Sequence, residues 1–246
     1  MTTQLTPRAI DISVVMPVMN ERENIAVLLP RLKATLKREG LGYELLVVDG
    51  NSKDGSREVA EAFGARVMAE RKRGYAGALT TGVAEACGDY ILTLDADLSH
   101  DPCFINRMWE ARTHGDIVIA SRYARGGHAY TGWMRKRLSN LLNWVMRRML
   151  AMPIDDLSSG FRLYKRAVVQ NLSLESRNFE IQEEILVKAY TNGFSVTEVP
   201  FVYFPRHSGK SHARVIRFGI DLARCAIKLR KLRRLADSNG HNESGH

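Results

Sequence analysis

Apolar residues in the first half of the chain follow two alternating patterns. Short runs of β-forming residues, such as ISVVMPV and ELLVV, alternate with longer segments in which apolar residues recur every three or four positions, as at Ile25, Leu28 and Leu32. The short runs are typical of strands buried on both faces, and the longer segments are typical of amphipathic helices. Residues 11–121 therefore predict a doubly wound α/β unit with parallel strand pairing.

The elements expected in this half follow from the same pattern. Strands are expected at DISVVMPV, YELLVVD, ARVMAE, DYILTLDAD and DIVIASR. Between them, helices are expected at NIAVLLPRLKATLKRE, SREVAEAFG, YAGALTTGVAEACG and CFINRMWEARTHG. The third of these helices is rich in small residues, which indicates close packing on the sheet.

The second half has a less regular pattern. It predicts a short strand and turn at FRLYKRAVV, a helix over 180–192 and a single strand at FSVTEVPFVYF. Segments 133–151 and 213–235 combine an apolar stripe with many Lys and Arg residues, so both predict basic amphipathic helices. We expect one domain over residues 1–236, divided into halves at 11–121 and 122–236, and a disordered polar tail over 237–246.

Length and cysteine content restrict the class of protein. A chain of 246 residues can bury a sizeable core. Its cysteines, Cys87, Cys103 and Cys225, have the spacing of neither a disulfide framework nor a metal site. The start of the chain lacks the apolar run of a signal peptide, and no stretch reaches the ~20 apolar residues that cross a bilayer. These features predict a cytoplasmic protein in a reducing compartment.

Positive charge is concentrated in the second half. The net charge is +9, yet residues 122–148 alone carry seven Lys and Arg residues with no acid, and residues 206–235 carry ten with only Asp221. Such polarity indicates an anionic partner, which is a phosphate, a membrane or a nucleic acid. A solvated basic face is the simpler explanation for either segment alone.

Polar residues follow four of the expected strands at the point where each strand ends. They are Asn20 and Glu21, Asp49 with Asn51 and Ser52, Asp95 with Asp97, and Ser121 with Arg122. Because ligands of open α/β sheets bind at the carboxyl ends of the strands, these residues predict a binding site at one edge. Asp54 has two readings here, as a site residue or as a turn and helix-capping residue.

In the stretch YILTLDADLSHDP, two carboxylates directly follow the apolar residues of an expected strand. Asp95 and Asp97 repel each other unless a cation joins them, and the hard ions Mg²⁺ and Mn²⁺ take oxygen ligands. Mg²⁺ typically binds one or two carboxylates together with substrate phosphates, which fits an Asp-x-Asp pair. Exposed loop acids are the alternative explanation.

Six motifs in order along residues 11–220 carry a family resemblance. The motifs are PVMNERENI, VVDGNSKDGS, DADLSHDP, IASRYARGG, SSGFRLY and PRHSGKS. Together they resemble the family 2 glycosyltransferases of the GT-A fold, and most closely the dolichyl- and polyprenyl-phosphate mannose synthases. The resemblance implies a nucleotide-sugar donor, with GDP-mannose favoured, a Mg²⁺ or Mn²⁺ cofactor, and inverting transfer of a hexose to a polyprenyl phosphate.

The resemblance also implies roles for individual residues. The nucleoside pocket would be lined by Pro17, Met19, Glu21 and Asp49. The diphosphate and the metal would be surrounded by Asp95, Ala96 and Asp97, with Ser99 in the position of a further metal ligand. Phosphate would be contacted by Arg122 and Arg206. Asp97, Arg122 and Arg206 are the catalytic residues of this scheme. The chain departs from the family pattern at Gly50, where the family has a second Asp, and at His212, where it has a Lys that Lys210 would replace. Asp155 and Asp156 are expected either to orient the sugar or to end a helix.

A polyprenyl acceptor lies in a membrane, which gives the two basic segments a second explanation. An apolar stripe flanked by Lys and Arg is what an interfacial helix needs, although the stripes would equally pack on the sheet. We expect a cytoplasmic protein that associates peripherally with a membrane surface.

Three other functions are compatible with parts of the pattern. A soluble glycosyltransferase of the same fold would share the donor site and differ in its acceptor. A nucleotidyltransferase would instead consume a nucleoside triphosphate. A nucleic-acid-binding module would use the basic segments, but they lack recognised motifs and aromatic platforms beyond Trp133 and Trp144, so no nucleic-acid partner is expected.

Overall fold

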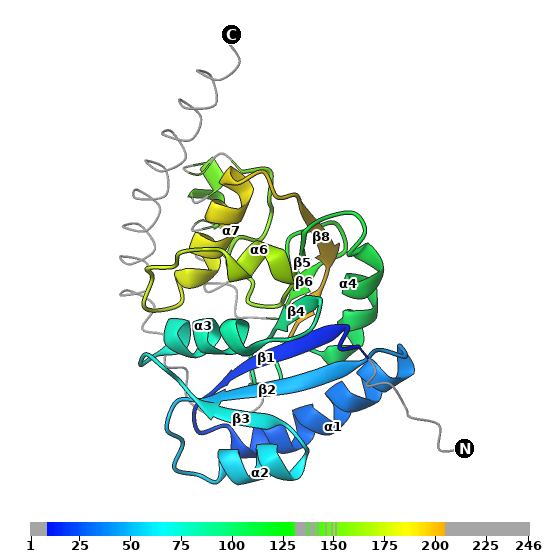
Figure 1. Cartoon of the computed structure of the whole chain (residues 1–246). Helices are drawn as coiled ribbons and strands as arrows, with labels where there is room; N and C mark the ends of the chain where they lie inside the picture. The colour runs from blue at the N-terminus through cyan, green and yellow to red at the C-terminus, as the bar shows by residue number, and fades with distance from the viewer. Residues whose placement is uncertain are drawn as a thin grey trace, which may run out of the picture.

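The computed structural model describes residues 9–130 and 152–204, together with positions 137, 141, 143–145, 147, 148 and 150. Its main feature is a seven-stranded sheet in the order β3-β2-β1-β4-β7-β5-β8, and a smaller sheet pairs β6 with β9 (Figure 1). The predictions for the segment 213–235 and the tail lie outside the described residues. The described positions between 137 and 150 are helical, and the rest of the segment 133–151 lies outside the description.

The strands have the following bounds: β1 Ile12–Val18, β2 Tyr43–Asp49, β3 Arg66–Ala69, β4 Tyr90–Thr93, β5 Ile117–Ser121, β6 His128–Ala129, β7 Arg162–Lys165, β8 Val196–Pro200 and β9 Val202–Tyr203. The helices are α1 Arg22–Arg38, α2 Ser56–Ala62, α3 Tyr75–Glu85, the 3-10 helix η1 Pro102–Phe104, α4 Ile105–Ala111, α6 Arg166–Gln170 and α7 Ile181–Thr191. The five strands and the helices expected between them in the first half are thus present.

Parallel pairing joins β1, β2, β3 and β4, as expected, whereas β5 pairs in parallel with β8 of the second half. β1 pairs in parallel with β2 and with β4, and β2 pairs in parallel with β3. The exception is β7, which lies between β4 and β5 and is antiparallel to both. The sheet is therefore mostly parallel, with one reversed strand that comes from the second half of the chain.

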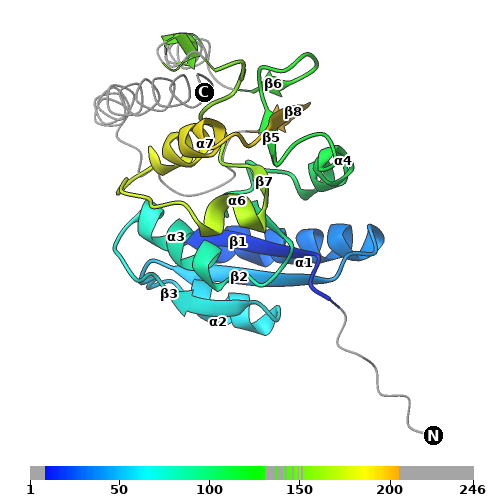
Figure 2. The ribbon, with the colours of Figure 1, turned by 45° about the horizontal axis from the view of Figure 1, so that its top comes forward.

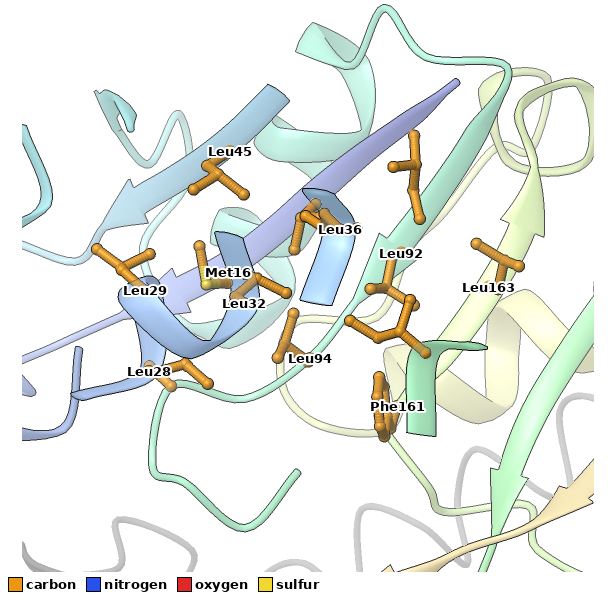
Figure 3. Packing of buried hydrophobic residues seen from close by; sticks show 14 of the residues in the cluster. Met16, Leu28, Leu29, Leu32, Leu36, Leu45, Leu92, Leu94, Phe161 and Leu163 are labelled. Atoms are coloured by element: carbon orange, nitrogen blue, oxygen red, sulfur yellow. The ribbon is translucent and has the colours of Figure 1, made fainter. Parts of the chain in front are cut away.

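Helices cover both faces of the sheet. Helices α1, α2 and α4 lie on one face, and α3, α6 and α7 lie on the other (Figure 2). Alternation along β1 assigns its side chains to these two layers, because Val14 and Met16 pack with α1 while Val15 packs with α3. Figure 3 shows the α1 side, where Leu28, Leu32 and neighbouring residues meet the sheet.

The structure corrects three details of the predicted elements. β4 ends at Thr93 rather than at Asp97, because the Asp95 amide donates to the His100 side chain. The expected turn after FRLYK is the short helix α6. FSVTEVPFVYF is split into β8 and β9, because the chain leaves the main sheet at Phe201, whose carbonyl accepts from the amide of His128 in β6.

In the part of the chain that the structure describes, no helix is both long and apolar enough to cross a membrane.

Candidate active site at the carboxyl edge of the sheet

The predicted strand ends meet at one edge of the sheet. Val18 at the end of β1 pairs with Asp49 at the end of β2, and Val15 pairs with Thr93 at the end of β4. β5 runs in the same direction as β4, because β7 is antiparallel to both strands. The carboxyl ends of β2, β4 and β5, with Asp49, Asp95 and Arg122 at or after them, therefore share one edge, as the sequence predicted.

Backbone amides after β1 are tied to side chains after β2. Asn20 N donates to Ser52 Oγ and Glu21 N donates to Ser56 Oγ, each at 2.9 Å. Arg22 N donates to Asp54 Oδ2 at 3.0 Å, and Asp54 also accepts from Ser56. Of the two readings of Asp54, the contacts support the turn and helix-capping one, because its carboxylate satisfies amides at the starts of α1 and α2.

The predicted nucleoside pocket is formed by these two loops. Pro17 and Glu21 are half-buried, Met19 is 46% exposed, and Asp49 is buried with its carboxylate accepting from Ser52 N at 3.1 Å. A Cβ added at Gly50 would lie 3.5 Å from Met19 Cβ, which is an ordinary contact distance. A Cβ is therefore accommodated at position 50, so a clash of the Cβ does not explain the glycine that stands where the resemblance implies a second Asp.

The paired acids after β4 lie in different environments. The Asp95 side chain is 36% exposed, whereas Asp97 and Ser99 are buried. Asp97 Oδ1 accepts from Ser99 N at 3.1 Å and from the Ser99 hydroxyl group. In the structure Ser99 thus orients Asp97, and its predicted role as a metal ligand remains a prediction. Ala96 between the two acids is buried in the core cluster on the α1 side.

His100 holds the backbone of this segment, a role that the sequence did not predict. Its Nδ1 accepts from Asp95 N at 3.0 Å, so in a neutral ring the proton is on Nε2, which lies 4.0 Å from Asp95 Oδ2. The ring is buried and stacks on Phe161 with centroids 5.1 Å apart. Its position three residues after Asp97 was the only sequence signal for this contact.

The donor set at Asp95 and Asp97 fits a hard divalent cation that is shared with a ligand. Among the described residues, no group of three or more His, Cys, Asp and Glu side chains gathers around one point. Two carboxylates are nevertheless what Mg²⁺ typically takes from a protein when phosphate oxygens and water supply its other ligands. The exposed carboxylate of Asp95 and the oriented carboxylate of Asp97 meet that requirement.

Arg122 follows β5 and forms a bidentate ion pair with Asp156. Its Nε and Nη2 donate to Asp156 at 2.8 and 2.7 Å, and Nη2 also donates to Ser158 Oγ at 2.7 Å. Burial alone would raise the pKa of Asp156, but the charge and hydrogen bonds of Arg122 outweigh burial and lower it. The same attraction raises the pKa of Arg122 against its own burial.

Asp156 is fully buried, so it contributes to the floor of the site rather than to its open surface. Asp155 N and Asp156 N donate to Glu198 on β8 at 2.7 and 2.9 Å, and the Asp155 side chain pairs with Arg147 at 2.5 Å. These contacts favour a role in fixing Arg122 over the two roles that the sequence had left open for Asp156.

Two predicted site residues have no described placement. Arg206 and Lys210, with the departing position His212, lie outside the described residues. Conversely, Gln182 on α7 was not predicted, and its side chain reaches the edge through Tyr75, whose hydroxyl group contacts Asp95. No periodicity or motif marks Gln182 as a site residue.

Comparison with known proteins places these features in a family. The profile of "Glycosyl transferase family 2" matches residues 13–173. A dolichol-phosphate mannosyltransferase from Pyrococcus furiosus is 36% identical over 81% of this chain, and the chain spans 58% of that protein's length. A polyprenol monophosphomannose synthase from Mycolicibacterium smegmatis is 32% identical over 80% of this chain and 79% of its own.

Solved structures with low sequence identity share the fold. Glucosyl-3-phosphoglycerate synthase from Mycobacterium tuberculosis, crystallised with Mn²⁺, uridine diphosphate and its product, has a TM-score of 0.71 at 18% identity, covering 89% of this chain and 79% of its own. The same protein with Mg²⁺ and uridine diphosphate has a TM-score of 0.69 at 19% identity, covering 91% of this chain and 79% of its own. These likenesses confirm the GT-A fold that the sequence predicted.

Proposed function

This chain is a member of glycosyl transferase family 2, and from that premise we propose that it transfers a hexose from a nucleotide sugar to a polyprenyl phosphate. Mannose is the favoured hexose and GDP-mannose the favoured donor. The observation that carries the proposal is the identity of 32–36% with two polyprenyl-phosphate mannose transferases over four-fifths of the chain. The arrangement of the carboxyl edge supports it independently.

The donor half of the proposed site is the edge formed by β1, β2 and β4. The loops after β1 and β2 would hold the nucleoside against Pro17 and Asp49, and Asp95 and Asp97 would hold Mg²⁺ or Mn²⁺ against the diphosphate. When bound, the cation would offset the charge that develops on the departing diphosphate.

The proposed reaction is a single displacement that inverts the sugar. An oxygen of the acceptor phosphate attacks the anomeric carbon, the bond from that carbon to the diphosphate oxygen breaks, and a nucleoside diphosphate leaves. The acceptor needs no strong general base, because the second pKa of a phosphate monoester is about 6 and the group is already anionic at neutral pH. The site must instead hold two anions side by side.

Arg122 is the described cation that is best placed for this purpose. Its guanidinium is fixed in two directions by Asp156 and Ser158, so it is oriented before any ligand binds. A phosphate at Arg122 would share the guanidinium with Asp156. The charge of Asp156 weakens the attraction between the guanidinium and the phosphate, but the guanidinium keeps its orientation. Arg206 and Lys210 are the further cations that we propose for the acceptor phosphate.

Access to a polyprenyl acceptor requires contact with a membrane surface, and we propose that the association is peripheral. Large apolar side chains are exposed at Leu141 and Trp144 on the helical positions between 137 and 150. Tyr130 and Phe204 are also exposed and stack with centroids 5.5 Å apart. Exposed aromatic and aliphatic groups beside basic residues suit the headgroup boundary of a bilayer.

The experiment that tests the function is a screen of nucleotide sugars with a polyprenyl phosphate and Mn²⁺ or Mg²⁺, in which products are identified by mass spectrometry. We expect a polyprenyl-phosphate hexose that forms with wild-type protein and disappears when the metal is chelated. Asp97→Ala is expected to lower turnover by at least about a hundredfold, because the variant lacks a carboxylate at the diphosphate.

Asp89→Ala is the matched control, since this exposed acid lies at the opposite end of β4 and pairs with Arg166 only at 3.7 Å. Turnover of Asp97→Ala equal to that of the control would contradict the assignment of the acid pair. Transfer to a water-soluble acceptor, with none to the lipid, would replace the proposed acceptor by that of a soluble glycosyltransferase.

A further inference from the structure

The hydroxyl group of Tyr75 contacts the exposed acid of the pair. Tyr75 is the first residue of α3, and its hydroxyl group donates to Asp95 Oδ1 at 3.2 Å. The hydroxyl group therefore lies where it can donate to this carboxylate.

A second side chain fixes the direction of this hydrogen bond. Gln182 Nε2 donates to the Tyr75 oxygen at 2.9 Å, so the hydroxyl proton is left to point at Asp95. On its other side, Gln182 Oε1 accepts from the Tyr164 hydroxyl group at 3.4 Å, which sets the orientation of the amide. The three groups form a chain of donors, Tyr164 to Gln182 to Tyr75, that ends on Asp95.

Packing holds the Tyr75 ring at this place. The ring stacks on Phe179 with centroids 4.4 Å apart and planes inclined by 28°. Gly160 borders the contact, since a Cβ there would lie 3.3 Å from the Tyr75 oxygen, 3.5 Å from Gln182 Nε2 and 3.7 Å from Asp95 Oδ1. The glycine of the SSGFRLY motif thus leaves room for the Tyr75, Gln182 and Asp95 groups to meet.

We propose that Tyr75, oriented by Gln182, is a positioning residue that fixes the Asp95 carboxylate for the donor diphosphate and its cation. The inference rests on the proposed function, which supplies the ligand at Asp95. The bond from Tyr75 restricts the rotation of a carboxylate that is 36% exposed, so binding has to restrict it less. Hydrogen bonds from neighbouring side chains that orient metal-binding carboxylates typically strengthen metal binding by one to two orders of magnitude.

The first test is Tyr75→Phe, which keeps the stack on Phe179 and removes the donor. Binding of GDP and of UDP is measured calorimetrically, once with Mn²⁺ and once with a chelator. We expect the affinity in the presence of Mn²⁺ to fall roughly tenfold, as for a lost hydrogen bond to a charged group. Affinity in the chelator should stay within about twofold, because the nucleoside contacts are unchanged.

Tyr90→Phe is the matched control for loss of a tyrosine hydroxyl group. Tyr90 begins β4, the strand that leads to Asp95, and its ring packs edge-on against Trp109 far from the carboxyl edge. It is expected to bind both nucleotides with Mn²⁺ as the wild type does. Equal loss in the two variants would show a general effect of removing a tyrosine hydroxyl group and would overturn the proposal.

The second test separates orientation from direct contact. Gln182→Met keeps the volume of the side chain but removes the donor to Tyr75, and we expect a smaller loss of Mn²⁺-dependent affinity, of roughly threefold. The double variant with Tyr75→Phe should bind no more than about twofold more weakly than Tyr75→Phe alone, because Gln182 acts on Asp95 through Tyr75. Additive losses would contradict this dependence.

Failure of the inference differs from failure of the proposed function. If wild-type protein binds Mn²⁺ with a nucleoside diphosphate and Tyr75→Phe binds equally well, Tyr75 does not position Asp95 and the function is unaffected. If wild-type protein binds neither GDP nor UDP, both proposals are overturned together.

Discussion

At the carboxyl edge of the sheet, the acids are held by neighbouring hydrogen-bond donors. Asp95 accepts from Tyr75, Asp97 from Ser99 and Asp49 from Ser52 N. Such bonds fix the direction of a carboxylate and leave its charge in place, which suits the cation and the ribose that we propose for this edge. Because the donors are ordered by the fold, little reorganisation accompanies binding.

Glu183 is an acid near this edge that the proposed chemistry does not use. It is 1% exposed, and among the described residues its Oε2 has no hydrogen-bond partner. Burial raises the pKa of Glu183 from its usual 4.5 to about 7, although the charge of Arg162 opposes this shift. A buried acid with a raised pKa destabilises the folded state once it ionises.

The pH dependence of stability follows from this pKa. Below about pH 4.5 the acid is protonated in both states and has no unfavourable effect. Stability is lost as the pH rises from about 4.5 to about 7, because the unfolded state releases this proton first, and the loss is complete above about 7. Glu183→Gln is expected to raise the free energy of unfolding by less than about 1 kcal/mol at about pH 5 and by roughly 3 kcal/mol at about pH 8. Urea unfolding at the two pH values measures this, and an equal change at both would exclude ionisation as the cause.

Among the elements, α3 packs closely on the sheet. It contributes Ala76, Leu79 and Val83 to the core cluster that includes Val15 and Leu46. A Cβ at Gly82 would lie only 2.3 Å from Val15 Cγ1 and 3.1 Å from Val48 Cγ2. The small residue at 82 is therefore what lets α3 approach β1 and β2, and that approach carries Tyr75 to Asp95.

Gly82→Ala is expected to destabilise the fold for this reason. Overpacking of a core costs about 1–3 kcal/mol, and the better helix propensity of alanine offsets up to about 1 kcal/mol of it. We expect a net loss of roughly 1–2 kcal/mol in denaturant unfolding. Gly50→Ala is the control, because its Cβ would meet its neighbours at 3.5 Å. A stability of Gly82→Ala at or above that of the control would refute the packing argument.

Local pattern was sufficient for the elements of the first half and insufficient for those of the second. β1 to β5 have apolar runs and flanking turn residues that mark them, and the parallel pairing of β1 with β2 and β4 brings Asp49 and Asp95 to one edge. The reversed insertion of β7 depends on pairing with both β4 and β5, which no local pattern encodes. The bond from Gln182 to Tyr75 joins residues 107 positions apart, so it too depends on tertiary structure.

For Arg122, the sequence predicted the position of the residue but not its ion-pair partner. The motif IASRYARGG marked this residue as a phosphate contact, and the structure places it at the expected edge. Its pairing with the buried Asp156 was not predicted, because two adjacent acids in a loop gave no sign of which one would turn inward. Burial decides the role of such a residue, and burial is a property of the packed chain.

At the scale of the whole molecule, the uneven charge is the property that most affects its partners. A net charge of +9 with basic residues concentrated in 122–148 and 206–235 favours association with an anionic surface. Each basic residue near an anionic leaflet contributes about 1 kcal/mol, and the effect falls off within the Debye length of about 8–10 Å at physiological salt. Attraction of this kind is reversible and sensitive to salt.

Flotation with vesicles tests that property. We expect the chain to rise with vesicles that contain phosphatidylglycerol, to rise less with purely zwitterionic vesicles, and to be released from the former as salt is increased. Trp144→Ala is expected to lower the bound fraction severalfold, because the indole, which is 62% exposed, would enter the headgroup region. Val27→Ala on α1 replaces another exposed apolar residue and should change nothing.

The outcomes distinguish the two acceptors that the fold permits. Charge alone would give salt-sensitive binding that Trp144→Ala does not alter, whereas insertion at the interface requires the tryptophan. A chain that stays at the bottom of the gradient with every vesicle, yet transfers sugar to a water-soluble acceptor, would make the basic segments a solvated face. The donor site would then be retained, since Asp95 and Asp97 are positioned by α3 and by the loop after β4 rather than by either basic segment.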